Sequence, residues 1–231
     1  MFIENIDLWV YGIRTTLLLA ILGTIIGLVI ALILVVMKIQ TINKNTPPLQ
    51  KSLKVVAKRF ATMYVGFFRG TPMIVQGMLF YYGMFSLGVD IPIIGAGLIV
   101  VSLNTSAYLT EVIRAGLNGL DKGQTEASLS LGLTMGQTYK KVLFPQALRN
   151  MIPAIGNELV VNIKDTAVLS VIGVAELFYI SRSVGSSAYN YVEAFLIVSL
   201  IYLVLVHIAI WLLEFFTKQN IDQKSQSEGA L

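Results

Sequence analysis

Residues 121–146 read DKGQTEASLSLGLTMGQTYKKVLFPQ, a polar stretch between two apolar parts of the chain. Asp121 with Gln124, and Thr134 with Gln137, have the spacing of a capping box. In that motif an N-cap side chain and the residue three positions later exchange hydrogen bonds with each other's backbone. The stretch therefore predicts two helix starts in the middle of a hydrophobic chain.

Two further residues predict where these helices stop. Gly132 stands after the first helix, because glycine tolerates the left-handed conformation at C′. Pro145 should end the second helix, because proline lacks an N–H donor and clashes inside a helix. We expect a helix, a glycine turn and a second helix beside the membrane. Such a hairpin is either a docking surface for another protein or an ordinary amphipathic linker, and spacing alone does not decide between them.

The same stretch resembles the EAA loop of ABC importer permeases. Glu126 and Ala127 open the pattern, Gly132 follows at the family's distance, and a Val-Leu-Phe-Pro run closes it at Pro145. Ser128 replaces the second alanine of the pattern. The flanks SAYLTEVIRAGL and PQALRNMIPAIGNELV resemble the branch of the family that takes up polar amino acids, and the resemblance extends over about residues 17–216.

This resemblance implies the fold and the partners. It implies a type I ABC importer transmembrane domain and a permease subunit in the bacterial inner (cytoplasmic) membrane, acting on a polar amino acid, basic ones included. Its partners would be ABC ATPase subunits, an extracytoplasmic solute-binding protein, and a second permease that is an identical copy or a paralogue. ATP and Mg would bind the ATPase, and this chain would hold no cofactor, metal or catalytic residue. Coupling to the ATPase would involve Glu126, Ala127, Ser128, Gly132 and Pro145.

Composition independently indicates a membrane protein. The chain has 231 residues, of which 55% are hydrophobic and 13% charged, and its mean hydropathy is +0.74. A soluble domain cannot bury so much apolar surface. Without cysteine there are no disulfides, cysteine-ligated metals or cysteine nucleophiles. No Walker A motif is present, so any ATP that drives this protein is hydrolysed by another chain. The net charge of +4 reflects membrane topology rather than nucleic-acid binding.

Apolar runs and charges together predict an all-α integral membrane protein with five spans. The first run has no charge over 23 residues, about 34 Å of helix against ~30 Å of hydrocarbon. The loop after it, residues 38–59, carries six cations, Lys44 among them, and no acid, which places it in the cytoplasm and the N-terminus outside. The C-terminus is then inside. The predicted transmembrane domain is 13–217, with spans 15–37, 60–88, 91–115, 150–176 and 194–216, and a cytoplasmic tail follows at 218–231.

Several local features refine this topology. Residues 1–12 are predicted to be a separate amphipathic surface helix with Trp9 at the interface. A kink is expected at Pro72 and a break at Pro153 and Gly156. Residues 178–191 are polar and rich in Gly and Ser, and so predict an outer loop. A G-x-x-x-G step in the first span would let another helix approach closely.

Two spans carry polar stripes that predict a substrate path. Each has three polar residues at i, i+4 and i+7, within about 60° of the helix circumference. Carboxylates near the bilayer centre cost at least ~2.5–3.5 kcal/mol each, so these should face protein or a water-filled cavity. Asp165 would bind the ammonium group of the substrate. Lys164 would bind the carboxylate group of the substrate or act in gating. The predicted path comprises Asn104, Tyr108, Glu111, Glu158, Asn162, Lys164 and Asp165.

The sequence also allows other roles for the polar residues and other classes of transport protein. The polar residues could serve helix packing, with Asp165 paired to Lys164 or Arg114. A channel or an ion-driven secondary transporter would also use buried carboxylates, and the ATP dependence of uptake distinguishes these classes. An intramembrane enzyme is not supported, because no nucleophile–base pair or metal-ligand cluster is evident.

Overall fold

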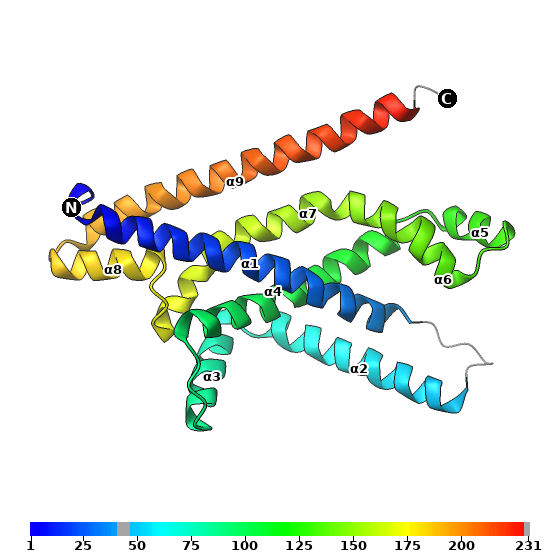
Figure 1. Ribbon diagram of the computed structural model, residues 1–231, viewed down its shortest axis with the longest axis horizontal. Helices are drawn as coiled ribbons and strands as arrows, with labels where there is room; N and C mark the ends of the chain where they lie inside the picture. The colour runs from blue at the N-terminus through cyan, green and yellow to red at the C-terminus, as the bar shows by residue number, and fades with distance from the viewer. Residues whose placement is uncertain (41–46, 229–231) are drawn as a thin grey trace.

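The computed structural model describes residues 1–40 and 47–228, and the regular elements in those ranges are all helical. Four long helices run along the molecule, a further long helix lies beside them, and a shorter one turns away at one side (Figure 1). Short helices close the two ends. The long helices are α1 (Ile6–Ile39), α4 (Ile93–Asn118), α7 (Phe144–Asp165) and α9 (Tyr191–Glu228). The side helices are α2 (Pro48–Gly70) and α3 (Met73–Ser86). At one end lie η1 (Ile3–Asn5) and α8 (Leu177–Ser187), with η3 (Thr166–Ile172) leading to α8, and at the other lie α5 (Lys122–Ser130), α6 (Met135–Thr138) and the π turn η2 (Tyr139–Leu143).

The helices account for much of the predicted membrane domain. Within the described ranges, three single helices are long and apolar enough to cross a membrane, namely Ile3–Ile39, Ile93–Asn118 and Tyr191–Thr217. A pair of helical segments, Met135–Ile172 and Leu177–Ser187, meets the same test together with a bend of 55°, as a broken span or a re-entrant loop does. The predicted spans 15–37, 91–115 and 194–216 thus correspond to single helices. Lys44 of the predicted cytoplasmic loop and residues 229–231 of the tail lie outside the described residues.

Close packing of α1 on α4 explains the G-x-x-x-G step. A Cβ atom added to Gly23 would lie 2.5 Å from the Val101 side chain, and one added to Gly27 would lie 3.0 Å from Thr105. Larger residues would therefore separate the two helices. The step serves contact within the chain in this structure.

The N-terminal segment differs from its prediction. Residues 6–12 are the first turns of α1 itself rather than a separate surface helix. Trp9 is fully buried, and packs with Leu177, Ile180 and Val198 of α8 and α9. The prediction was wrong because no helix breaker separates the segment from the span, and because α8 and α9 cover it.

The second predicted span, 60–88, is broken rather than kinked. α2 ends at Gly70, α3 begins at Met73, and α3 turns away from the bundle (Figure 1). Pro72 has no N–H and disfavours a helical conformation for the residue before it, so Thr71 is extended. The side chain of Gln76 then donates to the carbonyl oxygens of Phe68 and Thr71, each at 2.9 Å.

The fourth predicted span, 150–176, also ends differently. α7 continues through Pro153 and Gly156 without the predicted break, and stops at Asp165. Gly156 lets α7 and α9 pack closely, because a Cβ there would meet the end of the Leu213 side chain of α9 and displace it. The chain then makes the 3-10 turn η3, which ends at Gly173, whose φ is +94°.

Residues 178–191, predicted as an outer loop, are mostly helical. They form most of α8, which packs against α9. The polar composition wrongly indicated a loop, because the small residues of this segment instead allow α8 to pack closely on α9. A Cβ at Gly185 would lie 3.1 Å from that of Ala194, and Ser181 bonds back to the carbonyl of Phe178.

Candidate coupling hairpin and substrate path

The first helix of the 121–146 hairpin begins as predicted, with a simpler cap. The Asp121 carboxylate accepts a hydrogen bond from the Gly123 amide at 2.7 Å. Gln124 does not complete a capping box; its side-chain oxygen accepts from Gln146 instead, at 3.4 Å. That contact ties the start of the hairpin to the first turn of α7.

The turn of the hairpin is formed by a local hydrogen-bond pattern. Gly132 has a φ of +81°, and the amides of Gly132 and Leu133 bond back to Leu129 and Ser128 at 2.9 and 3.1 Å. This is the Schellman arrangement expected of a C′ glycine. The predicted capping box of Thr134 and the glutamine at 137 is complete in both directions.

Pro145 does not end the second helix, contrary to the prediction. The short helix α6 continues through the π turn η2 directly into α7, and Pro145 lies in the first turn of α7. A π turn widens the helix by one residue, which accommodates a proline that cannot donate an i→i−4 bond. Leu143 of this turn is buried among Val35 of α1, Ile113 of α4 and Met151 of α7. The hairpin is therefore continuous with α7 and anchored in the bundle core.

The first three residues of the family pattern lie on the first helix of the hairpin. Glu126 and Ala127 are exposed, whereas Ser128 is buried and bonds to the carbonyl of Gln124 at 2.7 Å. Apolar side chains project around the turn, with Leu131 82% exposed. An apolar tip at the end of the molecule is the kind of surface that a partner covers.

The predicted path residue Asn104 belongs to the network at the α2–α3 break. Its amide nitrogen donates to Gln76 at 2.9 Å and to the carbonyl of Phe68 at 3.4 Å. Sequence reasoning missed Gln76, which is 5% exposed. Nearby, the guanidinium of Arg69 lies 5.5 Å from the ring centre of Tyr108, at cation–π distance.

Asn162 joins three helices. Its amide nitrogen donates to the hydroxyls of Thr24 in α1 (2.8 Å) and Thr105 in α4 (2.9 Å). The side chain is buried, at 3% exposure. In this conformation Asn162 serves helix packing, the alternative left open by the sequence, and does not reach an accessible surface.

Asn162→Leu should lower stability by about 1–2 kcal/mol, because hydrogen bonds between membrane helices contribute about 0.6 kcal/mol on average and two are lost. Thermal unfolding in detergent measures the change. Asn157→Leu makes the same substitution at an exposed position of α7, and should leave the midpoint nearly unchanged. Equal midpoints for wild type and Asn162→Leu would show that the three-helix contact is energetically unimportant.

Three further predicted path residues share α7. Asp165 and Lys164 are exposed, and Glu158 is half-buried. Among the described residues, the ion pairs do not include one from Asp165 to Lys164 or Arg114. Glu158 and Asp165 are seven residues apart, and so lie on one face of the helix. This face carries charge that no other part of the described chain neutralises by an ion pair.

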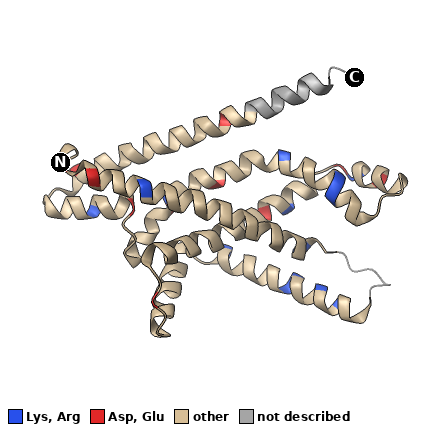
Figure 2. Cartoon of the chain, in the orientation of Figure 1, with Lys and Arg blue, Asp and Glu red and all other residues tan. Residues whose placement is uncertain are grey.

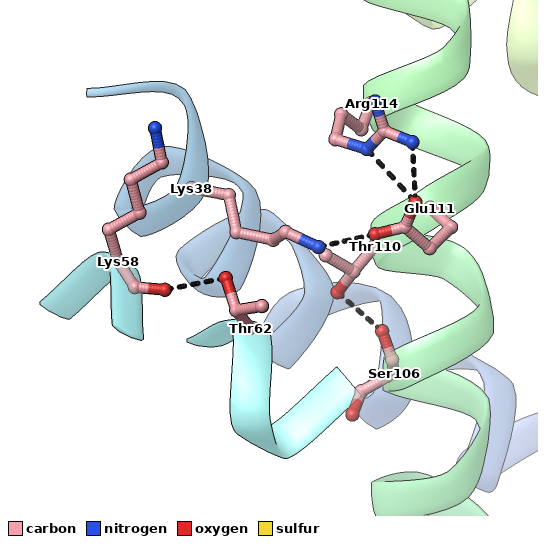
Figure 3. Close-up of polar contacts among 7 residues, drawn as sticks. All are labelled: Lys38, Lys58, Thr62, Ser106, Thr110, Glu111 and Arg114. Atoms are coloured by element: carbon pink, nitrogen blue, oxygen red, sulfur yellow. Dashed lines mark hydrogen bonds and ion pairs between the residues drawn. The ribbon is translucent and has the colours of Figure 1, made fainter. Parts of the chain in front are cut away.

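Glu111 is engaged on both oxygens. Lys38 of α1 donates to one, and Arg114 of α4 donates to the other through two nitrogens at 2.9 and 2.7 Å (Figure 3). The residue therefore bridges two helices in this conformation.

Sequence reasoning also missed Glu176, which is fully buried. Its carboxylate accepts from the amides of Phe178 and Tyr179 at 2.8 Å each, and from the hydroxyl of Tyr202 at 3.0 Å. It caps α8 and fixes α8 to α9. Within the described ranges, no three His, Asp or Glu residues lie together in a way that could hold a metal ion.

Comparison with known proteins agrees with this architecture. A family model described as "binding-protein-dependent transport system inner membrane component" matches residues 51–220. The chain belongs to this family. The permease resembles the arginine transport system permease protein ArtQ of Bacillus subtilis (strain 168), at 38% identity over 88% of each chain. It is also 35% identical to the putative glutamine transport system permease protein GlnP of Rickettsia conorii, over 95% of this chain and 96% of that one.

Solved structures confirm the fold of the permease. One described as an amino acid ABC transporter with histidines matches with a TM-score of 0.85 and 35% identity, covering 94% of this chain and 96% of that one. A methionine ABC transporter in an inward-facing conformation matches with a TM-score of 0.77 at 21% identity, which concerns the fold alone. The all-helical, type I ABC importer fold and the resemblance to amino-acid permeases are therefore confirmed, and the chain is a multi-pass membrane protein.

Proposed function

We propose that this chain is the permease subunit of an ATP-driven importer for a polar amino acid in the bacterial cell membrane. The observation that carries the proposal is the 121–146 hairpin. It combines an exposed apolar tip with a rigid, uninterrupted connection to α7. A separate ATPase that binds ATP and Mg would seat on this tip. An extracytoplasmic binding protein would deliver the amino acid at the opposite end.

The distribution of charge supports an orientation with the hairpin in the cytoplasm. Lys and Arg residues gather on the first half of α2 and near the hairpin (Figure 2). Cytoplasmic loops of membrane proteins carry this excess of cations. The N-terminus is then outside, the chain crosses the membrane five times if α2 with α3 and α7 with η3 each count as one span, and the C-terminal tail is inside.

Energy from the ATPase would enter through the hairpin. The path from α6 through η2 to α7 contains no loop, so displacement of the hairpin moves the helix that carries Glu158 and Asp165. ATP binding would then shift the population between inward-facing and outward-facing states, because the docked ATPases favour one position of the hairpin over the other.

A second permease would cover the charged face of α7. Facing lipid, a carboxylate near the bilayer centre costs at least ~2.5–3.5 kcal/mol. Asp165 is exposed in this chain, so a water-filled cavity shared with a second copy or a paralogue gives it a stable environment. This cavity is the proposed translocation path.

The side chains on that face suit an amino acid. Asp165 and Glu158 would bind the ammonium group, or the cationic side chain of a basic substrate, and Lys164 the carboxylate. Tyr108, held under Arg69, would line the adjacent wall. The relatives' names, arginine and glutamine transport, support a polar substrate for this chain too.

Asp165→Asn should raise the KM for uptake about tenfold or more, since a hydrogen bond to a charged group contributes about 1.5–3 kcal/mol. Uptake of labelled amino acid into proteoliposomes that contain the assembled transporter measures this. Glu214→Gln neutralises an exposed carboxylate on α9 instead, and should keep the wild-type KM. A wild-type KM in Asp165→Asn would remove this residue from the path.

The proposed function itself is tested by reconstituting the permease with its ATPase and binding protein. We expect uptake that requires ATP and persists when ion gradients are dissipated. Uptake that needs an ion gradient and ignores ATP would instead establish a secondary transporter or channel.

A further inference from the structure

A cluster of three charged residues joins α1 to α4 near the end that carries the hairpin (Figure 3). Glu111 accepts from the Lys38 ammonium on one carboxylate oxygen and from the Arg114 guanidinium on the other. Lys38 lies in the last turn of α1, 73 residues away from Glu111 in the sequence. The cluster thus contains one long-range bridge and one local i, i+3 pair.

Burial distinguishes the bridge from the local pair. The Lys38 and Glu111 side chains are 14% and 17% exposed, whereas Arg114 is 41% exposed. Exposed ion pairs contribute little, because water and salt screen them. A sheltered pair is costly to break from one side, since the remaining charge stays buried without compensation. Separating α1 from α4 here would leave Glu111 with only its local partner.

The position of the cluster relates it to the hairpin. Glu111 lies about two turns before α4 ends at Asn118, and the hairpin follows directly, with α5 beginning at Lys122. Beside it, an apolar cluster already joins α4, η2 and α7 to α1 through residues such as Val35 and Leu143. Any displacement of the hairpin therefore acts at once on α4 and α7, and reaches the end of α1 through these contacts.

We propose that Glu111 is a positioning residue for energy coupling: by holding Lys38 it makes the end of α1 move with α4 and the hairpin. This inference rests on the proposed function. It assigns Glu111 a role through its neighbours rather than through contact with substrate, because both of its carboxylate oxygens are occupied.

Lys38→Met breaks the bridge and leaves the local Glu111–Arg114 pair intact. We expect ATP hydrolysis to continue, and the number of ATP molecules hydrolysed for each amino acid transported to rise about fivefold or more. Fivefold is the lower end of the factors by which two coupled sites typically affect each other. The measurement uses proteoliposomes that contain the complete transporter, with uptake and phosphate release recorded in parallel. Lys38→Arg keeps a donor for Glu111, and should restore most of the coupling.

Lys58→Met is the matched control. Lys58 is an exposed cation on the neighbouring helix, and Figure 3 shows its ammonium directed away from the cluster. It should keep the wild-type ratio. A lower unfolding temperature in Lys38→Met with an unchanged ratio of ATP to substrate would make the bridge purely structural and overturn the proposal. Failure of the wild type to transport with ATP would instead overturn the proposed function.

Discussion

Gly132→Val should reduce ATP-driven uptake about 5–30-fold while leaving membrane insertion intact. The φ of +81° at this residue belongs to the left-handed region, where a residue with a Cβ pays about 1–2 kcal/mol, and that energy changes an equilibrium by the stated factor. A Cβ at Gly132 would meet no atom of the described chain within 4 Å, so the strain is in the backbone and not in a clash. The turn would relax and displace the apolar tip from its docking position.

Gly132→Asn separates the shape of the turn from other effects of a side chain. Asparagine adopts the left-handed conformation more readily than other residues, so this variant should keep most of the uptake. The amount of ATPase that remains on the permease during mild purification should follow the same order. Normal uptake in Gly132→Val would mean that the turn does not contribute to docking.

Glu176→Ala should destabilise the permease by about 3 kcal/mol or more, because a buried donor left without a partner costs about 1–3 kcal/mol and three donors lose theirs. The donors are the amides of Phe178 and Tyr179 and the hydroxyl of Tyr202. α8 would lose both its cap and its attachment to α9. Thermal or denaturant unfolding in detergent would record the loss.

Two variants control for this effect. Tyr202→Phe removes one of the three bonds, and should cost less than half as much. Glu193→Ala removes an exposed carboxylate that accepts one bond from Asn190, and should change stability by no more than about 0.5 kcal/mol. Equal stability of Glu176→Ala and wild type would show that water replaces the carboxylate at little cost.

Features that depend on a few neighbouring residues were predictable from the sequence. The left-handed glycine at 132 and the capping box of Thr134 and Gln137 involve partners no more than five residues apart. Apolar runs likewise predicted the three single spanning helices. In each case the chain nearby already contains the groups that determine the structure.

Predictions from single residues or short stretches were wrong where helix packing or helix geometry decided the structure. A proline usually ends a helix, but here the π turn makes room for Pro145 in the first turn of α7. The small polar residues near Gly185 are typical of a loop, but they let α8 approach α9 closely. Trp9 resembles an interface anchor, and α8 and α9 cover it completely.

The polar contacts that sequence reasoning missed are long-range. Asn104 bonds to Gln76 across 28 residues, and Tyr202 bonds to Glu176 across 26. Periodicity within one helix shows which side chains share a face, but it does not show which face of another helix they meet. The substrate path expected for the stripe with Asn104 and Glu111 stays a prediction, and in this structure both residues make contacts between helices that periodicity does not indicate.

The central claim, that the hairpin docks on a separate ATPase, can be tested by site-specific crosslinking. The chain contains no cysteine, so one introduced thiol is unique. Leu131→Cys places it at the tip of the hairpin, where the native side chain is 82% exposed, and Val192→Cys places it at the opposite end of the molecule, at a residue 72% exposed. A thiol–amine crosslinker is applied to native membranes, and the captured proteins are identified by mass spectrometry. The account predicts that a P-loop ATPase is captured from position 131 and not from position 192; capture of no ATPase from position 131, or equal capture from both positions, would contradict it.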